Sequence, residues 1–250
     1  LNLQGLEFIY EKRLFPELEY IFKHALIQEV AYNSLLQKRR KEIHEKIGKA
    51  IEQIYINRLE EFYEVLAYHY LKAANHMKAY QYLVQAGDAA ARVYAYAESR
   101  QHYVMALEAL AQLSDTEGNH LRRVDTLIKQ AGSSYRDDPL EQNLTRLIEA
   151  ERIAKDLPSP DGTPGGDLLR LARIHYWMGR VYYIANKMPE AIGYFEQVLE
   201  EAEELDEPEL LLIPSLSTGM IMFVQGHLDK AKALLSRAIP ASAQMGKWPD

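Results

Sequence analysis

The stretch from Asp167 to Ala202 constrains the fold most, because it carries two apolar stripes at helical spacing. The first stripe comprises Ile174, Met178, Val181 and Tyr182, and the second comprises Ile192, Phe195, Val198 and Leu199. Such spacing is typical of one buried face of an α-helix. Between the stripes, Asn186 can adopt the left-handed conformation that ends a helix, and Pro189 suits the first position of the next one. The stretch therefore predicts two antiparallel helices joined by a short turn.

Small residues at the predicted helix contact relate the stretch to a known repeat. Gly179 and Ala191 would let the two helix axes approach to about 8–10 Å. The stretch resembles the tetratricopeptide repeat. Its glycine, aromatic, alanine and second aromatic positions hold Gly179, Tyr182, Ala191 and Phe195. Val198 replaces the usual last alanine, and the tryptophan and closing proline of the repeat are missing.

Weaker copies of the pattern recur on both sides of this stretch. A later copy comprises Gly219, Met222, Ala231, Leu235 and Ala238, with Gly226 ending its first helix. An earlier, degenerate copy opens at Gly132 and Tyr135, and its second helix begins at Asp138-Pro139. Two overlapping copies further upstream share one helix at about 77–94. The first holds Ala67, Tyr70, Ala79, Leu83 and Ala86, and the second holds Gly87, Ala90, Ser99, Tyr103 and Ala106. The predicted fold is all-α, a right-handed superhelix of antiparallel helix pairs.

The N-terminal region follows a different pattern. Leu6, Phe8 and Tyr10 alternate with polar residues, as do Leu18, Tyr20 and Phe22 after Pro16, which predicts a short β-hairpin. Helical periodicity begins after His24. Ser34 is a candidate N-cap for a second, longer helix.

A second resemblance concerns this N-terminal region. The run YIFKHALIQEVAY at 20–32, followed by Ser34, Leu35, Leu36, Arg40 and His44, resembles the junction between winged helix and repeats in bacterial STAND-type signalling ATPases, many of which carry a nucleotide cyclase. The resemblance implies that 1–56 is the end of a winged-helix region and that 57–250 are repeats, with a linker at 158–166. It also implies that the chain is part of a longer protein. His24 would contact the β-phosphate of ADP in that protein, although Ala25 departs from the aspartate of the family motif.

Composition and motifs exclude several function classes. The net charge of −7 disfavours nucleic acid, and the basic run at 37–41 is followed by Glu42 and Glu45 without interleaved aromatic residues. There is no cysteine, no apolar run long enough to span a membrane, no secretion signal and no phosphate-binding loop. The eight histidines lack metal-ligand spacing. We therefore expect a cytoplasmic, non-catalytic chain without metal, cofactor, nucleic-acid or membrane binding.

The first helix of each pair should line the concave face of such a superhelix, where repeat proteins bind their partners. The predicted partner-binding positions there are Arg122, Lys129, Arg136, Arg173, Tyr176, Arg180 and Tyr183. Arginine and tyrosine favour a protein ligand, an acidic peptide or another domain of the parent chain. One alternative is that these arginines pair with glutamates across the repeat. A free-standing repeat adaptor and an enzyme of unrecognised type are the alternative functions.

Overall fold

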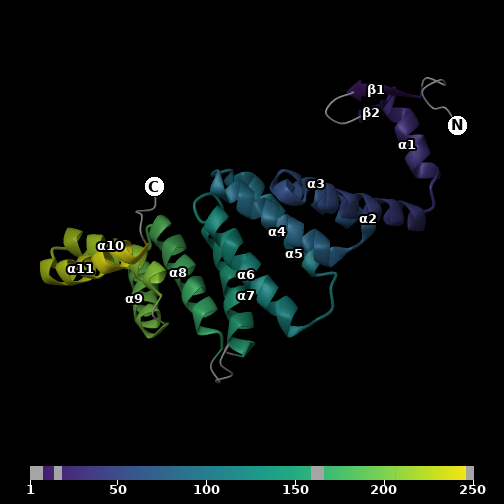
Figure 1. Cartoon of the computed structure of the whole chain (residues 1–250). Coiled ribbons are helices and arrows are strands. Elements are labelled where there is room, and N and C mark those ends of the chain that lie inside the picture. The colour runs from purple at the N-terminus through teal and green to yellow at the C-terminus, as the bar shows by residue number, and fades with distance from the viewer. Residues whose placement is uncertain (1–7, 14–18, 159–165, 206, 246–250) are drawn as a thin grey trace. The chain divides into compact units, whose positions relative to one another are not determined.

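The computed structural model describes residues 8–13, 19–158, 166–205 and 207–245. The chain divides into two compact units, with the boundary between Ala79 and Tyr80. This division falls inside helix α4 (His76–Arg92), and the boundary predicted at residue 56 lies within the first unit. The described chain is mainly α-helical with one N-terminal hairpin, as predicted (Figure 1).

The first unit begins with the predicted hairpin. Strands β1 (Ile9–Arg13) and β2 (Glu19–Phe22) are antiparallel, and Tyr10 lies opposite Ile21. The elements that follow are α1 (Ala25–Ser34), α2 (Gln37–Ile54), a 3-10 helix (Ile56–Phe62) and α3 (Tyr63–Ala73). No described residue of α1 is buried, whereas α3 buries Leu66, Ala67 and Tyr70.

The predicted cap at Ser34 is wrong. Ser34 is the last residue of α1, and its hydroxyl donates a hydrogen bond back to the Ala31 carbonyl oxygen at 2.7 Å. Helix α2 is instead preceded by Leu36, whose side chain has no polar atom to cap it. The serine hydroxyl thus satisfies an orphan carbonyl at a helix end and not an orphan amide at a helix start.

The second unit is a succession of antiparallel helices. After α4 the helices are α5 (Tyr96–Leu110), α6 (Glu117–Ser134), α7 (Leu140–Asp156), α8 (Leu168–Ile184), α9 (Met188–Leu205), α10 (Pro208–Val224) and α11 (Leu228–Met245). Consecutive helices pack as α6 with α7, α8 with α9 and α10 with α11, as the repeat pattern predicted. The predicted linker falls between α7 and α8, and its residues 159–165 lie outside the described ranges.

Each helix pair depends on a small residue against a large side chain. A Cβ atom added to Gly179 would lie 2.6 Å from ring carbons of Phe195, across the contact of α8 with α9. The same relation links Gly219 in α10 with Leu235 in α11, at 2.9 Å. In α4, Gly87 lies against the Tyr103 ring, which shows that α4 pairs with α5. These contacts confirm the predicted register of the copies that contain Gly87, Gly179 and Gly219.

The turn signals are also confirmed. Asn186 has a φ of 59°, and Gly226 has a φ of 83°, so both take the left-handed conformation just beyond a helix end. Asparagine and glycine tolerate this conformation better than other residues. Pro189 lies in the first turn of α9, where a missing backbone N–H leaves no bond unmade.

The register of the degenerate copy differs from the prediction by one residue. Ala131, 1% exposed, is the small residue that packs in the buried cluster with Leu147 of α7. Gly132 instead faces Trp177 of α8, since a Cβ atom there would lie 3.0 Å from the indole ring. The glycine therefore permits contact between successive repeats and not within one.

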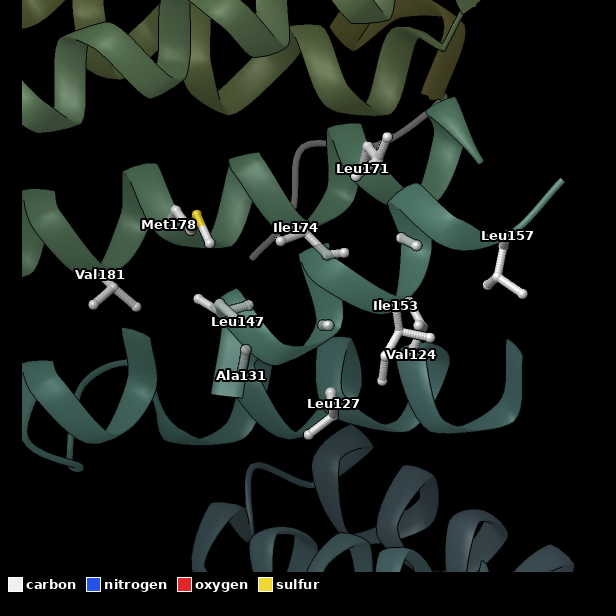
Figure 2. Close-up of a cluster of buried hydrophobic side chains, with 12 residues drawn as sticks. Val124, Leu127, Ala131, Leu147, Ile153, Leu157, Leu171, Ile174, Met178 and Val181 are labelled. Carbon is white, nitrogen blue, oxygen red and sulfur yellow. The ribbon is translucent and has the colours of Figure 1, made fainter. Parts of the chain in front are cut away.

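A continuous core joins α6, α7 and α8. Figure 2 shows side chains of the three helices pointing toward one another, among them Leu127, Leu147 and Ile174. Leu147 and Ile174 are completely buried. Full burial of such a side chain stabilises the fold by about 1.5–3 kcal/mol, so this core holds α6 and α8 in a defined relation.

Gly179→Ala should destabilise the protein by about 1–3 kcal/mol, because the new methyl group must displace the Phe195 ring. The matched control is Gly193→Ala on α9, where a Cβ atom meets nothing within 4 Å. Alanine there should be neutral or stabilising by up to about 1 kcal/mol. Urea unfolding measures both free energies, and equal midpoints for the two variants would refute the packing described for Gly179.

Candidate functional site

Arg180 lies among three aromatic rings where α8 approaches the end of α6. Its Nη1 donates to the Tyr176 hydroxyl oxygen at 3.0 Å, and its Nη2 donates to the Tyr135 hydroxyl oxygen at 2.9 Å. The guanidinium carbon is 4.9 Å from the ring centroid of Tyr135, 5.8 Å from that of Tyr176 and 6.0 Å from that of Trp177. These contacts hold the guanidinium plane in one position by hydrogen bonds and cation–π attraction.

Two contacts fix the spacing of α6 and α8 beside this group. Near the C-terminal end of α6, Gly132 leaves room for the Trp177 indole. Near the start of α8, Arg170 binds Asp125 of α6 through two hydrogen bonds of 2.7 and 2.8 Å. The hydrogen bonds to Asp125 and, less strongly, to Asp167 raise the pKa of Arg170. The cluster therefore stands on a braced pair of helices.

The arginines of this surface have no acidic partner among the described residues. Arg136, Arg173 and Arg180 form no ion pair with any carboxylate in the part of the chain that the structure describes. Arg136 only lies over the Tyr135 ring, with its guanidinium carbon 5.2 Å from the centroid. Burial raises the pKa of Tyr176, although Arg180 opposes this shift, so the phenol stays neutral and does not cancel the arginine charge. We call Tyr135, Arg136, Arg173, Tyr176, Trp177 and Arg180 the arginine face.

Two predicted binding residues lie elsewhere. Lys129 pairs with Asp88 of α4 at 2.5 Å, and Asp88 also accepts a hydrogen bond from the Tyr103 hydroxyl. Arg122 donates to the side-chain oxygen of Asn119, one turn earlier on α6, at 3.0 Å. The alternative prediction is that the arginines pair with glutamates. Lys129 does pair with an acidic residue, but with an aspartate, and Arg136, Arg173 and Arg180 pair with no glutamate among the described residues.

Tyr183 lines an apolar hollow between α8 and α10. The hollow has a volume of about 310 Å³ and is lined by Tyr183, Met188, Met220, Ile221, Val224 and Gln225. Met220 and Val224 are 52% and 80% exposed, so the hollow opens to solvent.

Sequence reasoning did not assign Trp177 and Tyr135 to the site. Tyr135 was interpreted as the aromatic position of a repeat, and it lies 45 residues before Arg180. The available signal was position: Trp177 precedes Arg180 by three residues, which places both on one face of α8.

His24, the predicted nucleotide sensor of the parent protein, stands at the N-terminus of α1. It is exposed, and its carbonyl oxygen accepts hydrogen bonds from the amides of Ile27 and Gln28. Its side chain makes no capping hydrogen bond. The ring is therefore accessible at a helix start, a position where backbone dipoles favour anions.

A larger hollow of about 550 Å³ lies among the ends of α5, α6 and α7. Its arginines already pair with carboxylates: Arg123 with Glu149 at 2.6 Å and Arg152 with Asp156 at 3.9 Å. Because the positive charge of these arginines is compensated, this hollow is less suited to an acidic ligand than the arginine face.

The described residues contain neither a cluster suited to a metal ion nor a membrane-spanning helix. Nowhere in the described ranges do three His, Asp or Glu side chains gather closely enough to hold a metal ion. Likewise, none of the helices in those ranges combines the length and apolar character needed to cross a bilayer.

Comparisons place the fold among helical repeat proteins. No protein-family model and no curated protein matches the sequence. A solved structure of Rap protein complexed with Competence and Sporulation Factor is similar over 88% of this chain, with a TM-score of 0.56 and 18% identity. The match covers 58% of the Rap chain. BtubC (BKLC) from P. vanneervenii is similar over 91% of this chain and 95% of its own, with a TM-score of 0.54 and 18% identity.

A separate polar cluster in the first unit joins α1, α2 and α3. The Nδ1 atoms of His44 and His69 are 2.9 Å apart, and the Tyr32 hydroxyl lies 3.2 Å from Nε2 of His44. Burial, and then the charge of Lys72, lower the pKa of His44; burial, and then His44, lower that of His69. Tyr68 packs edge-on against both imidazoles. The folded unit therefore favours neutral histidines.

Acidification should weaken this cluster. In the unfolded chain the imidazoles bind protons below about pH 6.5, whereas in the folded chain their pKa values are lower. The free energy of unfolding is therefore highest above about pH 6.5 and decreases as the pH falls through the lowered pKa values. Hydrogen exchange in α2 and α3, corrected for the intrinsic pH dependence, should show less protection at about pH 5 than at about pH 7.5. His69→Gln should flatten the difference, and an identical pH slope in the variant would contradict this assignment.

Proposed function

We propose that this chain is a non-catalytic recognition module whose arginine face binds an acidic segment of a protein. The observation that carries this proposal is the set of three arginines, Arg136, Arg173 and Arg180, which have no carboxylate partner among the described residues. Two of them, Arg136 and Arg180, lie over aromatic rings. The chain as a whole is acidic, with a net charge of −7, so a cationic surface that the described carboxylates leave unpaired is a local exception.

The chemistry of the face matches a carboxylate ligand. A guanidinium presents a planar fork that can donate two parallel hydrogen bonds to a carboxylate. Arg180 is preorganised by Tyr135 and Tyr176, so less conformational freedom is lost when it binds. Tyr176 and Trp177 supply rigid aromatic contact area, which is enriched at protein interfaces. Arg173 is exposed and lies about two helical turns before Arg180 on the same face of α8, so it can approach the same ligand.

The similarity to Rap protein supports a binding role. That helical repeat protein was crystallised in complex with Competence and Sporulation Factor. At 18% identity the similarity concerns the fold, so the ligand proposed for the present chain rests on the arginine face and not on the ligand of Rap protein.

We further propose that the module belongs to a larger cytoplasmic STAND-type signalling ATPase, with residues 1–56 as the end of its winged-helix region and 57–250 as its repeats. Supporting this, no described residue of α1 is buried, and Phe22, Leu26 and Val30 expose apolar side chains. An apolar hollow of about 510 Å³ lies between α1 and the hairpin. Such a surface is suited to packing against further domains of the parent protein, where His24 would contact nucleotide.

Reversal of charge on the arginine face tests the recognition role. Arg173→Glu combined with Arg180→Glu should reduce the affinity for a Glu-rich peptide at least about tenfold, because attraction becomes repulsion. Wild-type affinity should also fall as salt is raised. Calorimetry with the Glu-rich peptide, and with a Gln-rich peptide of equal length, measures both effects.

The control pair is Arg39→Glu with Arg152→Glu, which changes the net charge equally at exposed positions of α2 and α7. It should leave peptide affinity near that of the wild type. If the two double variants are folded and bind the peptide equally, the arginine face is not the binding surface.

A further inference from the structure

The arginine face and the apolar hollow adjoin each other on α8. Arg180 and Tyr183 are three residues apart, which corresponds to about 4.5 Å along a helix axis. Residues three apart on a helix are neighbours on its surface, so Arg180 and Tyr183 bring the two regions together. A ligand on the arginine face therefore lies beside the groove between α8 and α10.

The hollow exposes several apolar side chains to solvent. Five of its six lining residues are apolar or aromatic, and Met220 and Val224 are more than half exposed. Ile184 and Phe223, which adjoin the lining residues Tyr183 and Val224 in the sequence, are 45% and 55% exposed. Scattered apolar residues are normal on a protein surface, whereas a contiguous group beside a charged face marks an interaction site.

We infer that the ligand carries a large apolar side chain close to its acidic residue, and that this side chain enters the hollow while the carboxylate contacts Arg180 and Arg173. This inference rests on the proposed recognition of an acidic segment. An extended peptide advances about 3.3 Å per residue. The two ligand side chains are therefore one to three positions apart, with leucine, isoleucine or phenylalanine as the apolar member.

The charge of the face favours a peptide over other occupants of the hollow. The ligand must offer a carboxylate to the arginines and an apolar side chain to the hollow at the same time. A second copy of this chain would have to present both on one matching surface. A short segment with neighbouring acidic and apolar side chains does so with few ordered residues, which limits the entropy cost of binding.

The test is selection from a displayed library of random peptides, with the whole 250-residue chain as bait. The wild type should retain peptides with an acidic residue one to three positions from a large apolar residue. Met220→Asp combined with Val224→Asp should keep the acidic preference, lose the apolar one and bind the wild-type peptides at least about tenfold more weakly. Ile148→Asp on α7, at a site 56% exposed, is the control for adding charge and should select as the wild type does.

The outcomes separate the two proposals. Enrichment of acidic residues without a neighbouring apolar residue overturns this inference and leaves the recognition of an acidic segment standing. If the selected peptides are not enriched in acidic residues, or if the Arg173→Glu, Arg180→Glu variant selects the same peptides as the wild type, both proposals are overturned. A third outcome is that the wild type retains no peptide but self-associates, and that Met220→Asp combined with Val224→Asp abolishes the self-association. A second copy would then occupy the hollow, which also overturns the inference.

Discussion

The close contact of a small residue with a large side chain is the constraint on which the repeat region depends. Gly179 lies against the Phe195 ring, and Gly87 lies against the Tyr103 ring, at distances that a single Cβ atom would violate. These contacts set the separation of the helices within each pair, because neither the backbone nor the ring can move without opening the core. The packing of these pairs therefore also sets the positions of the side chains in the arginine face.

The contacts within pairs and those between successive pairs both combine apolar and polar interactions. Within a pair, apolar packing such as Gly179 against Phe195 is joined by polar contacts such as Arg123 with Glu149. Between pairs, α6 and α8 meet through the Arg170–Asp125 ion pair and through Gly132 against Trp177. The aromatic and cationic side chains on the adjoining surface are therefore held by a rigid base. This arrangement explains how Arg180 keeps a fixed orientation through two tyrosine hydroxyls, although no described carboxylate binds it.

Much of the helix layout could be predicted because its signals are local. Asn186 and Gly226 end helices by their own conformational preferences, and the hairpin follows from alternation along the chain. The sequence could not show that Ala131, and not Gly132, faces α7, because both are small and adjacent. It also could not show that Lys129 meets Asp88 while Arg180 meets Tyr135, since each partner lies more than forty positions away along the chain.

Trp177 provides the most direct measurement of the central claim, because its indole lies within 6.0 Å of the Arg180 guanidinium. Trp248 is the other tryptophan of the chain, so Trp248→Phe leaves Trp177 as the single reporter. Titration with a peptide of repeated Glu-Glu-Leu triplets should change the Trp177 emission in a saturable manner, and added salt should reverse the change. Emission that stays constant while calorimetry detects binding of the peptide would place the binding site elsewhere and contradict the account.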